Sequence, residues 1–524
     1  MKPEINTSLL PKSENEVSSK PSSISGAVFN VSTSMIGAGI MSIPATLKVL
    51  GLIPGFLVIL VMAFLVEVTV EFLLRYTNYS GEANTYGGIM AESFGKFGSV
   101  ALQICVMISN LGALIIYLII IGDVLSGDQS DGVLHSGILQ ECFGFHWWNA
   151  RAYSVLVIVI FVMLPLLLLP RVESLGHASA VSILLAVVFV VIISGMAVYA
   201  MVEGQTQPLK LVPEIDFSDG FSFFNLFTTI PVIATAFSCH VTIHPVRAEL
   251  ENQSEMKSAV RISLVLSVAI YIAVGFVGYL LFGDSIMADM LVNFDQASNS
   301  PGGLLVNAVV RLSYALHLML VFPVIFYSLR ANMDEMIFNG KSHDLADDTT
   351  RFVSITCVLL AFTYIVAIAI PNIWYFFQFM GSTTVACIAF VFPGAIVLRD
   401  VHGISTRIDR TMAIIVVILA AVTSVIAIST NLYNLDGPWQ NINPVDICSS
   451  QTCNCSSLSY TFQSHNLFET QGPEKHQAVA LRVTSDAAFY HCQFISHHYA
   501  REIGSVEYIE YILKTRYNAQ VITR

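Results

Sequence analysis

The sequence predicts an all-α polytopic membrane protein with about eleven transmembrane helices. Hydrophobic residues make up 55% of the 524 residues and charged residues only 12%, and the mean hydropathy is +0.69. Apolar runs long enough to cross ~30 Å of hydrocarbon recur along the chain. Lysine and arginine gather in alternate connecting segments, as they do in membrane proteins. These observations exclude an ordinary water-soluble globular protein.

The predicted spans follow one another closely from residue 25 to residue 433. They cover residues 25–50, 51–75, 99–121, 151–170, 174–202, 221–246, 259–282, 303–329, 352–370, 373–397 and 411–433. Before them, residues 1–24 are polar and Ser-rich, which predicts a disordered cytosolic tail without a cleavable signal peptide. After them, residues 434–524 form a polar tail.

The distribution of basic residues predicts the orientation. With the N-terminus inside, fifteen Lys and Arg residues fall on the cytoplasmic side, against Lys48, Arg151 and Lys210 on the other side before the tail. Cytoplasmic loops retain Lys and Arg, so we expect a cytoplasmic N-terminus and a lumenal or extracellular C-terminus. The net charge of −12 gives no indication of a nucleic-acid partner. The nine cysteines form no zinc pattern, so no metal and no cofactor are expected.

Helix-breaking residues are concentrated in the first apolar run. Gly26, Asn30 and Ser34 precede residues 35–44, which read Met-Ile-Gly-Ala-Gly-Ile-Met-Ser-Ile-Pro. We expect the helix to unwind there, and non-helical backbone at membrane depth has to line a cavity or lie within protein. Freed amides would suit a carboxylate, and freed carbonyls an ammonium group or a coupling cation. The alternative is that the small residues only allow close helix packing.

The sixth run repeats this pattern. Its polar and breaking residues are Thr228, Thr229, Pro231, Thr235, Ser238, Cys239 and His240, and it ends at His244-Pro245. Interrupted helices at positions one and six are typical of an inverted repeat of five plus five helices, which holds its substrate between them near the midplane. The eleventh span would lie outside this repeat.

The segments 26–30, 34–40 and 230–240 resemble the amino acid/auxin permease family, and are closest to its plant vacuolar-type and sodium-coupled neutral amino-acid branch. The likeness covers residues 25–433. It implies a LeuT-like fold plus one extra helix and transport by alternating access, with Gly37, Ala38, Gly39, Thr235 and Ser238 around the substrate. The complete predicted substrate-binding set is Asn30, Ser34, Ile36, Gly37, Ala38, Gly39, Thr235, Ser238 and His240.

The coupling ion is predicted to be a proton, or else flux is facilitative. In sodium-coupled relatives the counterpart of Asn30 and a threonine of the eighth span help to hold the cation, but residues 316–323 here carry no hydroxyl. Ionisable groups in the membrane are costly, so Glu67, His240 and His317 are candidates for ion coupling. Glu67 lies in mid-run without a helical partner of opposite charge, whereas Glu71 and Arg75 can form a helical ion pair. A structural role remains the alternative for each group, and Arg311 is expected to pair inside the bundle or to snorkel.

The polar tail contains a segment similar to plant pectinesterases, at about residues 466–524. The likeness rests on residues 472–483 and 489–492, with Gln477 at the position of the first family glutamine. His497-His498-Tyr499 replaces the family's Tyr-Gln-Asp, so the acid/base aspartate is missing. A β-helix needs several stacked coils, so we expect a degenerate fragment without esterase activity. It would be a gene fusion or a gene-model artefact.

Taken together, the residues and the resemblance predict a secondary active transporter of neutral amino acids and not an enzyme. The predicted partners are an amino-acid substrate, a coupling proton and the lipid bilayer, with sodium less favoured. The membrane would be vacuolar, another endomembrane or the plasma membrane. The alternatives are an amino-acid sensor without flux, and a transporter fused to a pectinesterase module judged inactive.

Overall fold

The computed structural model describes residues 23–80, 84–127, 135–168, 176–214, 220–295, 301–338 and 348–436. Residues 1–22 of the predicted cytosolic tail, the pectinesterase-like segment and the predicted C-terminal β-helix fragment lie outside these residues. The chain divides into two units, 1–442 and 443–524, and only the first contains described residues.

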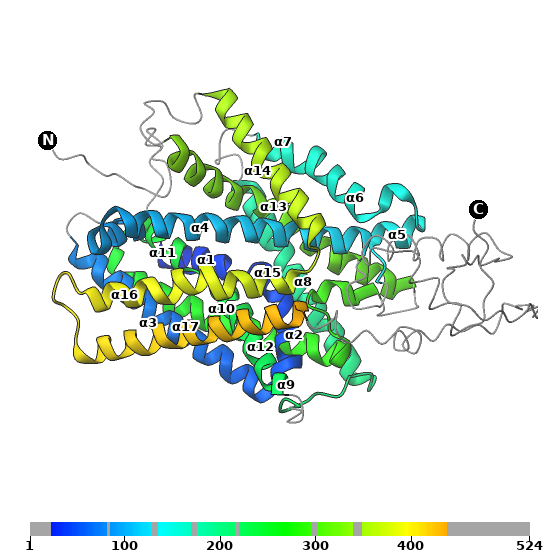
Figure 1. Ribbon diagram of the computed structural model, residues 1–524. Coiled ribbons are helices and arrows are strands. Elements are labelled where there is room, and N and C mark those ends of the chain that lie inside the picture. Colours follow the sequence, from blue (N-terminus) through cyan, green and yellow to red (C-terminus); the bar gives the residue numbers. More distant parts are fainter. Residues whose placement is uncertain are drawn as a thin grey trace, which may run out of the picture. The chain divides into compact units, whose positions relative to one another are not determined.

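The described chain is helical almost throughout (Figure 1). Its first half contains α1 (Ile24–Met35), the 3-10 segment η1 (Ala38–Ser42), α2 (Ile43–Leu50), α3 (Leu52–Tyr79), α4 (Tyr86–Ser126), α5 (Ile138–Phe143), α6 (Arg151–Ile158), α7 (Leu164–Leu167) and α8 (Gly176–Val202). Its second half contains α9 (Gly220–Asn225), α10 (Thr229–Ala236), α11 (His240–Glu249), α12 (Met256–Phe282), α13 (Pro301–Phe338), α14 (Thr349–Ala369), α15 (Ile373–Met380), α16 (Phe392–Arg399) and α17 (Arg407–Asp436).

The number of spans differs from the prediction. Within the described residues, nine helices are long and apolar enough to cross a membrane, and the bent pair of α1 with residues 38–50 makes ten. The count of eleven is therefore not supported. The fourth predicted span accounts for the difference, because its described helix, Arg151–Leu167, has 17 residues. That length corresponds to about 25 Å against ~30 Å of hydrocarbon, and the described residues of this segment end at 168.

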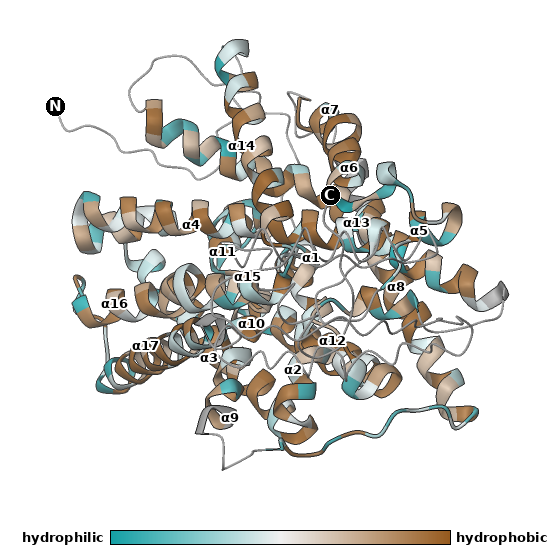
Figure 2. Cartoon of the chain, turned by 45° about the vertical axis from the view of Figure 1, so that its right-hand side comes forward, coloured by the Kyte–Doolittle hydropathy of each residue, from teal (hydrophilic) through white to brown (hydrophobic). Residues whose placement is uncertain are grey.

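The helices pack as a membrane bundle with apolar side chains on its outer surface. α4, α16 and α17 run alongside one another in Figure 1, and α13 packs on both α4 and α8. Figure 2 shows α17 hydrophobic along most of its length, and α17 residues such as Ile418 and Val425 are exposed. Water does not favour such a surface, whereas lipid does.

Both predicted breaks are confirmed. α1 ends at Met35, and the chain bends by 50° before it continues through residues 38–50. In the sixth span, α10 ends at Ala236 and α11 begins at His240. Each break falls at the small and polar residues that are poor helix formers. The remaining backbone groups at the breaks must find partners outside their own helices.

A close backbone contact holds the first half of the sixth span in place. A side chain at Gly381, which begins the π-helical segment Gly381–Val385, would collide with the carbonyl oxygen of Pro231 in α10. Only glycine allows this approach. The tenth span therefore supports α10 directly, just before α10 reaches its break.

Buried Arg311 pairs inside the protein, as one of the two predicted alternatives requires. Its side chain is 2% exposed and donates hydrogen bonds to Glu141 of α5 and to the carbonyl oxygen of Ser136. This contact ties the segment after α4 to the beginning of α13.

We predict that Glu141→Gln destabilises the protein by about 2 kcal/mol, because it leaves the buried Arg311 cation without a carboxylate. Thermal unfolding of the purified protein in detergent measures the change. Glu214→Gln is the matched control, since the Lys210–Glu214 pair is largely exposed and should contribute at most about 1 kcal/mol. Equal losses in the two variants would contradict this account of Arg311.

Candidate functional site

The first break exposes backbone groups in the middle of the bundle. Ile36 and Gly37 have non-helical dihedral angles, and the Gly37 amide bonds back to the Met35 carbonyl oxygen at 2.8 Å. The next amides, of Ala38 and Gly39, begin a helix and so have no partner within it. Such N–H groups at a helix start carry partial positive charge and suit a carboxylate.

Tyrosine hydroxyls approach the carbonyl groups at the first break. The Tyr314 hydroxyl of α13 donates to the Gly37 carbonyl oxygen at 2.8 Å. The Tyr117 hydroxyl of α4 would lie 3.3 Å from a Cβ added at Gly37. The Tyr271 hydroxyl of α12 lies 2.7 Å from the Met35 carbonyl oxygen. All three rings are buried, so their hydroxyls serve the break and not bulk solvent.

The two breaks meet. A Cβ at Gly39 would lie 2.9 Å from both Cα and Cβ of Ala236, the last residue of α10. The Tyr271 hydroxyl that approaches Met35 also lies 2.6 Å from the Ala236 carbonyl oxygen. Residues about two hundred positions apart in the sequence thus form one site.

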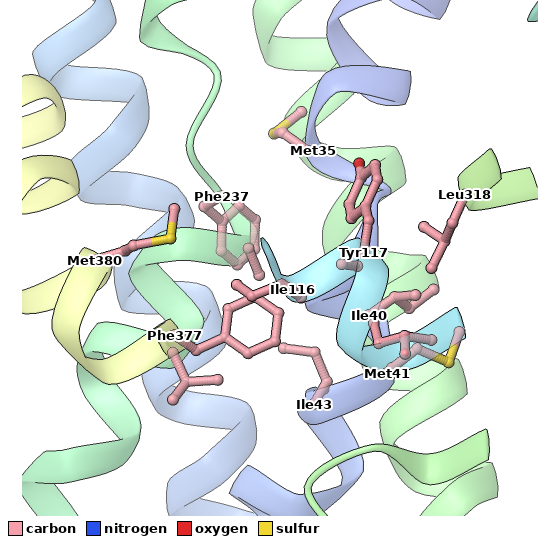
Figure 3. Packing of buried hydrophobic residues seen from close by; sticks show 14 of the residues in the cluster. Met35, Ile40, Met41, Ile43, Ile116, Tyr117, Phe237, Leu318, Phe377 and Met380 are labelled. Atoms are coloured by element: carbon pink, nitrogen blue, oxygen red, sulfur yellow. The ribbon is translucent and has the colours of Figure 1, made fainter. Parts of the chain in front are cut away.

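Side chains around this site are mainly apolar. Figure 3 shows Met35, Ile40 and Ile43 of the first span with Ile116 and Tyr117 of α4, Phe237 at the sixth-span break, and Phe377 and Met380 of α15. They belong to one buried hydrophobic cluster. Any ligand side chain held among them would be in apolar surroundings.

The predicted binding residues divide into two groups by environment. Ala38 and Gly39 are buried at the contact between the breaks, and Ile36, Gly37, Thr235 and Ser238 are half-buried beside it. The Thr235 hydroxyl donates to the carbonyl oxygens of Pro231, at 2.9 Å, and Phe377, at 3.3 Å. Asn30 and Ser34 are exposed on α1, roughly two turns and one turn before the break.

His240 follows the sixth-span break, and its ring nitrogen contacts α3. Its Nε2 lies 2.9 Å from the Thr69 hydroxyl of α3, and its ring is fully buried. One turn later, His244 makes the same contact with Thr77 of α3, also at 2.9 Å. The two histidines therefore attach α11 to α3. Participation of His240 in substrate binding or ion coupling stays a prediction.

His317 of α13 lies beside Tyr314, which contacts the first break. Its Nδ1 donates to the carbonyl oxygen of Ser182 in α8 at 2.7 Å, which places a proton on that nitrogen. Its ring packs against Tyr314 with 5.1 Å between ring centroids. Through Tyr314, His317 is one contact removed from Gly37.

Glu67 pairs with a basic residue of another helix. Its carboxylate lies 2.8 Å from the guanidinium of Arg261 in α12, and both side chains are partly exposed. Glu67 was expected to have no opposite charge on its own helix, and the partner found here belongs to α12, which periodicity within α3 could not reveal. A role of Glu67 in ion coupling stays a prediction. The expected Glu71–Arg75 pair is confirmed, and Lys257 joins it at 2.8 Å from Glu71.

Metal binding finds no support in the described ranges, where no group of three or more His, Cys, Asp or Glu side chains gathers. A cavity of 40 Å³ lies elsewhere, between α3, α10 and α17, and its lining residues, such as Met62 and Ala420, are mostly apolar. It includes none of the break residues 36–39 or 237–239. The contacts at the breaks are therefore the better guide to the functional site.

The three tyrosines were missed by sequence reasoning. Each lies within an apolar run, where a phenol hydroxyl has to find a partner. That requirement was a usable signal, but the sequence alone could not show that all three hydroxyls face the first break.

The sequence model of one protein family, described as "Transmembrane amino acid transporter protein", matches residues 20–434, which include both breaks. The chain belongs to this family. It is 55% identical to amino acid transporter AVT6C of Arabidopsis thaliana over 436 residues, which are 83% of this chain and 99% of that protein. It is 25% identical to sodium-coupled neutral amino acid transporter 7 of Danio rerio, over 75% of this chain and 82% of the relative.

Among solved structures, this protein resembles MhsT in complex with L-phenylalanine. The TM-score is 0.50 at 13% identity, over 77% of this chain and 98% of MhsT. This likeness concerns the fold, and it agrees with the predicted LeuT-like arrangement. The chain is thus a multi-pass membrane protein of an amino-acid transporter family, and the relatives named here are transporters and not enzymes.

We predict that Gly39→Ala abolishes most amino-acid uptake, because the added methyl group would overlap the α10 backbone and separate the two breaks. Uptake into vesicles at matched protein abundance measures this. Gly195→Ala in α8 is the control, since a Cβ there meets nothing within 4 Å. Normal uptake by the Gly39 variant would show that the contact of the breaks is not needed.

Proposed function

We propose that this protein is a secondary active transporter that moves neutral amino acids by alternating access. The observation that carries the proposal is the meeting of the broken first and sixth spans at Gly39 and Ala236. Helix-start amides offer a site for a carboxylate, and carbonyl groups at the ends of α1 and α10 suit an ammonium group. An amino acid presents both of these charges a short distance apart.

A neutral side chain fits the surroundings of the site. The side chains in Figure 3 that come from α4, α15 and the two broken spans are uncharged. A charged substrate side chain placed among them would lose hydration without gaining a counter-charge. The name of the Danio rerio relative, which specifies neutral amino acids, supports the same assignment.

The proposed repeat assigns the two breaks to equivalent positions. The two halves would begin at α1 and at the sixth predicted span, with the shorter helix Arg151–Leu167 counted as the fourth element of the first half and α17 outside the repeat. We place Asn30, Ser34, Ile36 and the segment Gly37–Gly39 on one side of the substrate. Thr235 and Ser238 would lie on the other side.

A proton is the proposed coupling ion, with facilitated flux as the alternative. The stretch 316–323 of α13 has no hydroxyl to complete a sodium site, but it contains His317 beside Tyr314. Histidine is the side chain whose charge changes most readily between neutral and acidic compartments. His240 and Glu67 remain further candidates, although their partners are Thr69 and Arg261.

We place the protein in the vacuolar or another internal membrane, with the plasma membrane as a further possibility, and its N-terminus in the cytoplasm. The predominance of Lys and Arg on one side supports this orientation. The pectinesterase-like tail has no proposed activity, because its acid/base aspartate is replaced by Tyr499.

We predict that the full-length protein in proteoliposomes accumulates labelled neutral amino acids when an inward proton gradient is imposed, and that a sodium gradient adds nothing. Equal uptake with and without any gradient would favour facilitated flux. Binding of amino acid without uptake under every gradient would instead identify a sensor.

We predict that His317→Gln abolishes stimulation by the proton gradient but leaves downhill uptake, because glutamine can still donate to the Ser182 carbonyl but cannot carry a proton. Uptake at several imposed pH differences measures this. The control is His146→Gln, at an exposed position after α5. Undiminished stimulation in the His317 variant would exclude this residue as the proton carrier.

A further inference from the structure

Tyr271 serves both broken spans with a single hydroxyl. Its oxygen lies 2.7 Å from the carbonyl oxygen of Met35, which ends α1, and 2.6 Å from that of Ala236, which ends α10. The side chain is fully buried, and its ring packs edge-on against Phe237 with centroids 4.9 Å apart. We call this arrangement the Tyr271 bridge.

The two carbonyl groups differ in how much they depend on the bridge. The Met35 oxygen also accepts the Gly37 N–H at 2.8 Å. For the Ala236 oxygen, Tyr271 is the donor found among the described residues. A tyrosine hydroxyl has one proton, so it can donate fully to only one oxygen at a time.

The electrostatics of the two helix ends oppose their approach. The C-terminus of a helix carries partial negative charge, and here two such ends converge on one point. Water is excluded at a fully buried position, so the carbonyl groups cannot be hydrated without separation of the half-helices. A hydrogen-bond donor between them offsets this repulsion.

We propose that Tyr271 is a positioning residue that keeps the end of α1 and the end of α10 together while no substrate is bound. This inference rests on the proposed transport function. When an amino acid is bound, its ammonium group supplies donors to the same carbonyl groups and makes the bridge dispensable. The hydroxyl therefore matters most in the step in which the unloaded carrier reorients.

Two modes of transport distinguish an effect on the unloaded carrier from an effect on the loaded carrier. Net uptake requires the unloaded carrier to return across the membrane in every cycle, whereas exchange of internal for external amino acid uses only the loaded carrier. Without the bridge, the unloaded protein shifts to arrangements in which the two ends part, and the fraction able to reorient falls. Reorientation of the loaded carrier is unaffected because the ammonium group of the substrate replaces the missing donor.

The test compares net uptake with exchange for the full-length Tyr271→Phe protein in proteoliposomes. We expect net uptake to fall roughly 5- to 150-fold, as the loss of a donor to a buried carbonyl implies, while exchange stays within about twofold of the unmodified protein. An equal fall in both modes, or no fall in either, would overturn the proposal.

The matched control is Ser263→Ala on the same helix. Ser263 donates to the Val28 carbonyl oxygen of α1 at 2.9 Å, two turns of α12 away from Tyr271, and the other acceptor near its hydroxyl, the Ala259 carbonyl oxygen, belongs to α12 itself. If the loss of any hydrogen bond between α12 and α1 were enough to slow the unloaded carrier, Ser263→Ala would also lower net uptake and leave exchange unchanged. We expect its ratio of exchange to net uptake to equal that of the unmodified protein.

Failure of the transport function itself would give a different result, because the unmodified protein would then show neither mode. If Tyr271→Phe does not fold, 3-fluorotyrosine at position 271 keeps the ring and strengthens the hydroxyl as a donor. A ratio of exchange to net uptake identical to that of the unmodified protein would then overturn the proposal.

Discussion

The organisation of this protein depends on one constraint: a backbone carbonyl or amide inside the membrane must have a partner. Unbroken helices meet that condition by themselves, but the first and sixth spans do not, because each is interrupted in mid-course. The surrounding helices are arranged to compensate. α12 and α13 direct Tyr271 and Tyr314 at the carbonyl groups of the interrupted backbone. We propose that the helix-start amides, which these tyrosines do not contact, receive the substrate.

Much of the fold follows from composition and local pattern. Hydropathy identifies nearly all of the spans, and Gly37 and Ser238 indicate where two of them break, because these residues act through the local backbone. For the fourth predicted span, hydropathy registers an apolar run over residues 151–170, whereas the helix described there is Arg151–Leu167. Local pattern therefore predicts where helices are and where they fail, but not how far each one continues.

The site was less predictable, because its decisive contacts join distant parts of the chain. Nothing near Glu67 in the sequence indicates Arg261, and nothing near His240 indicates Thr69. The same holds for the tyrosines of α12 and α13. In the sequence each is an ordinary member of an apolar run, and only helix packing brings its hydroxyl to the first break. Residues that act through their own backbone were found, and those that act through a side chain on another helix were not.

The glycines at the contact points of the broken spans have a consequence for sequence variation. At Gly39 and Gly381 a side chain would collide with backbone atoms of α10, so there is no flexible neighbour that could move aside. Every missense change of a glycine codon adds a side chain. These two codons should therefore tolerate almost no inherited variation, whereas a position such as Gly195, where a Cβ meets open space, should drift freely among natural variants of the gene.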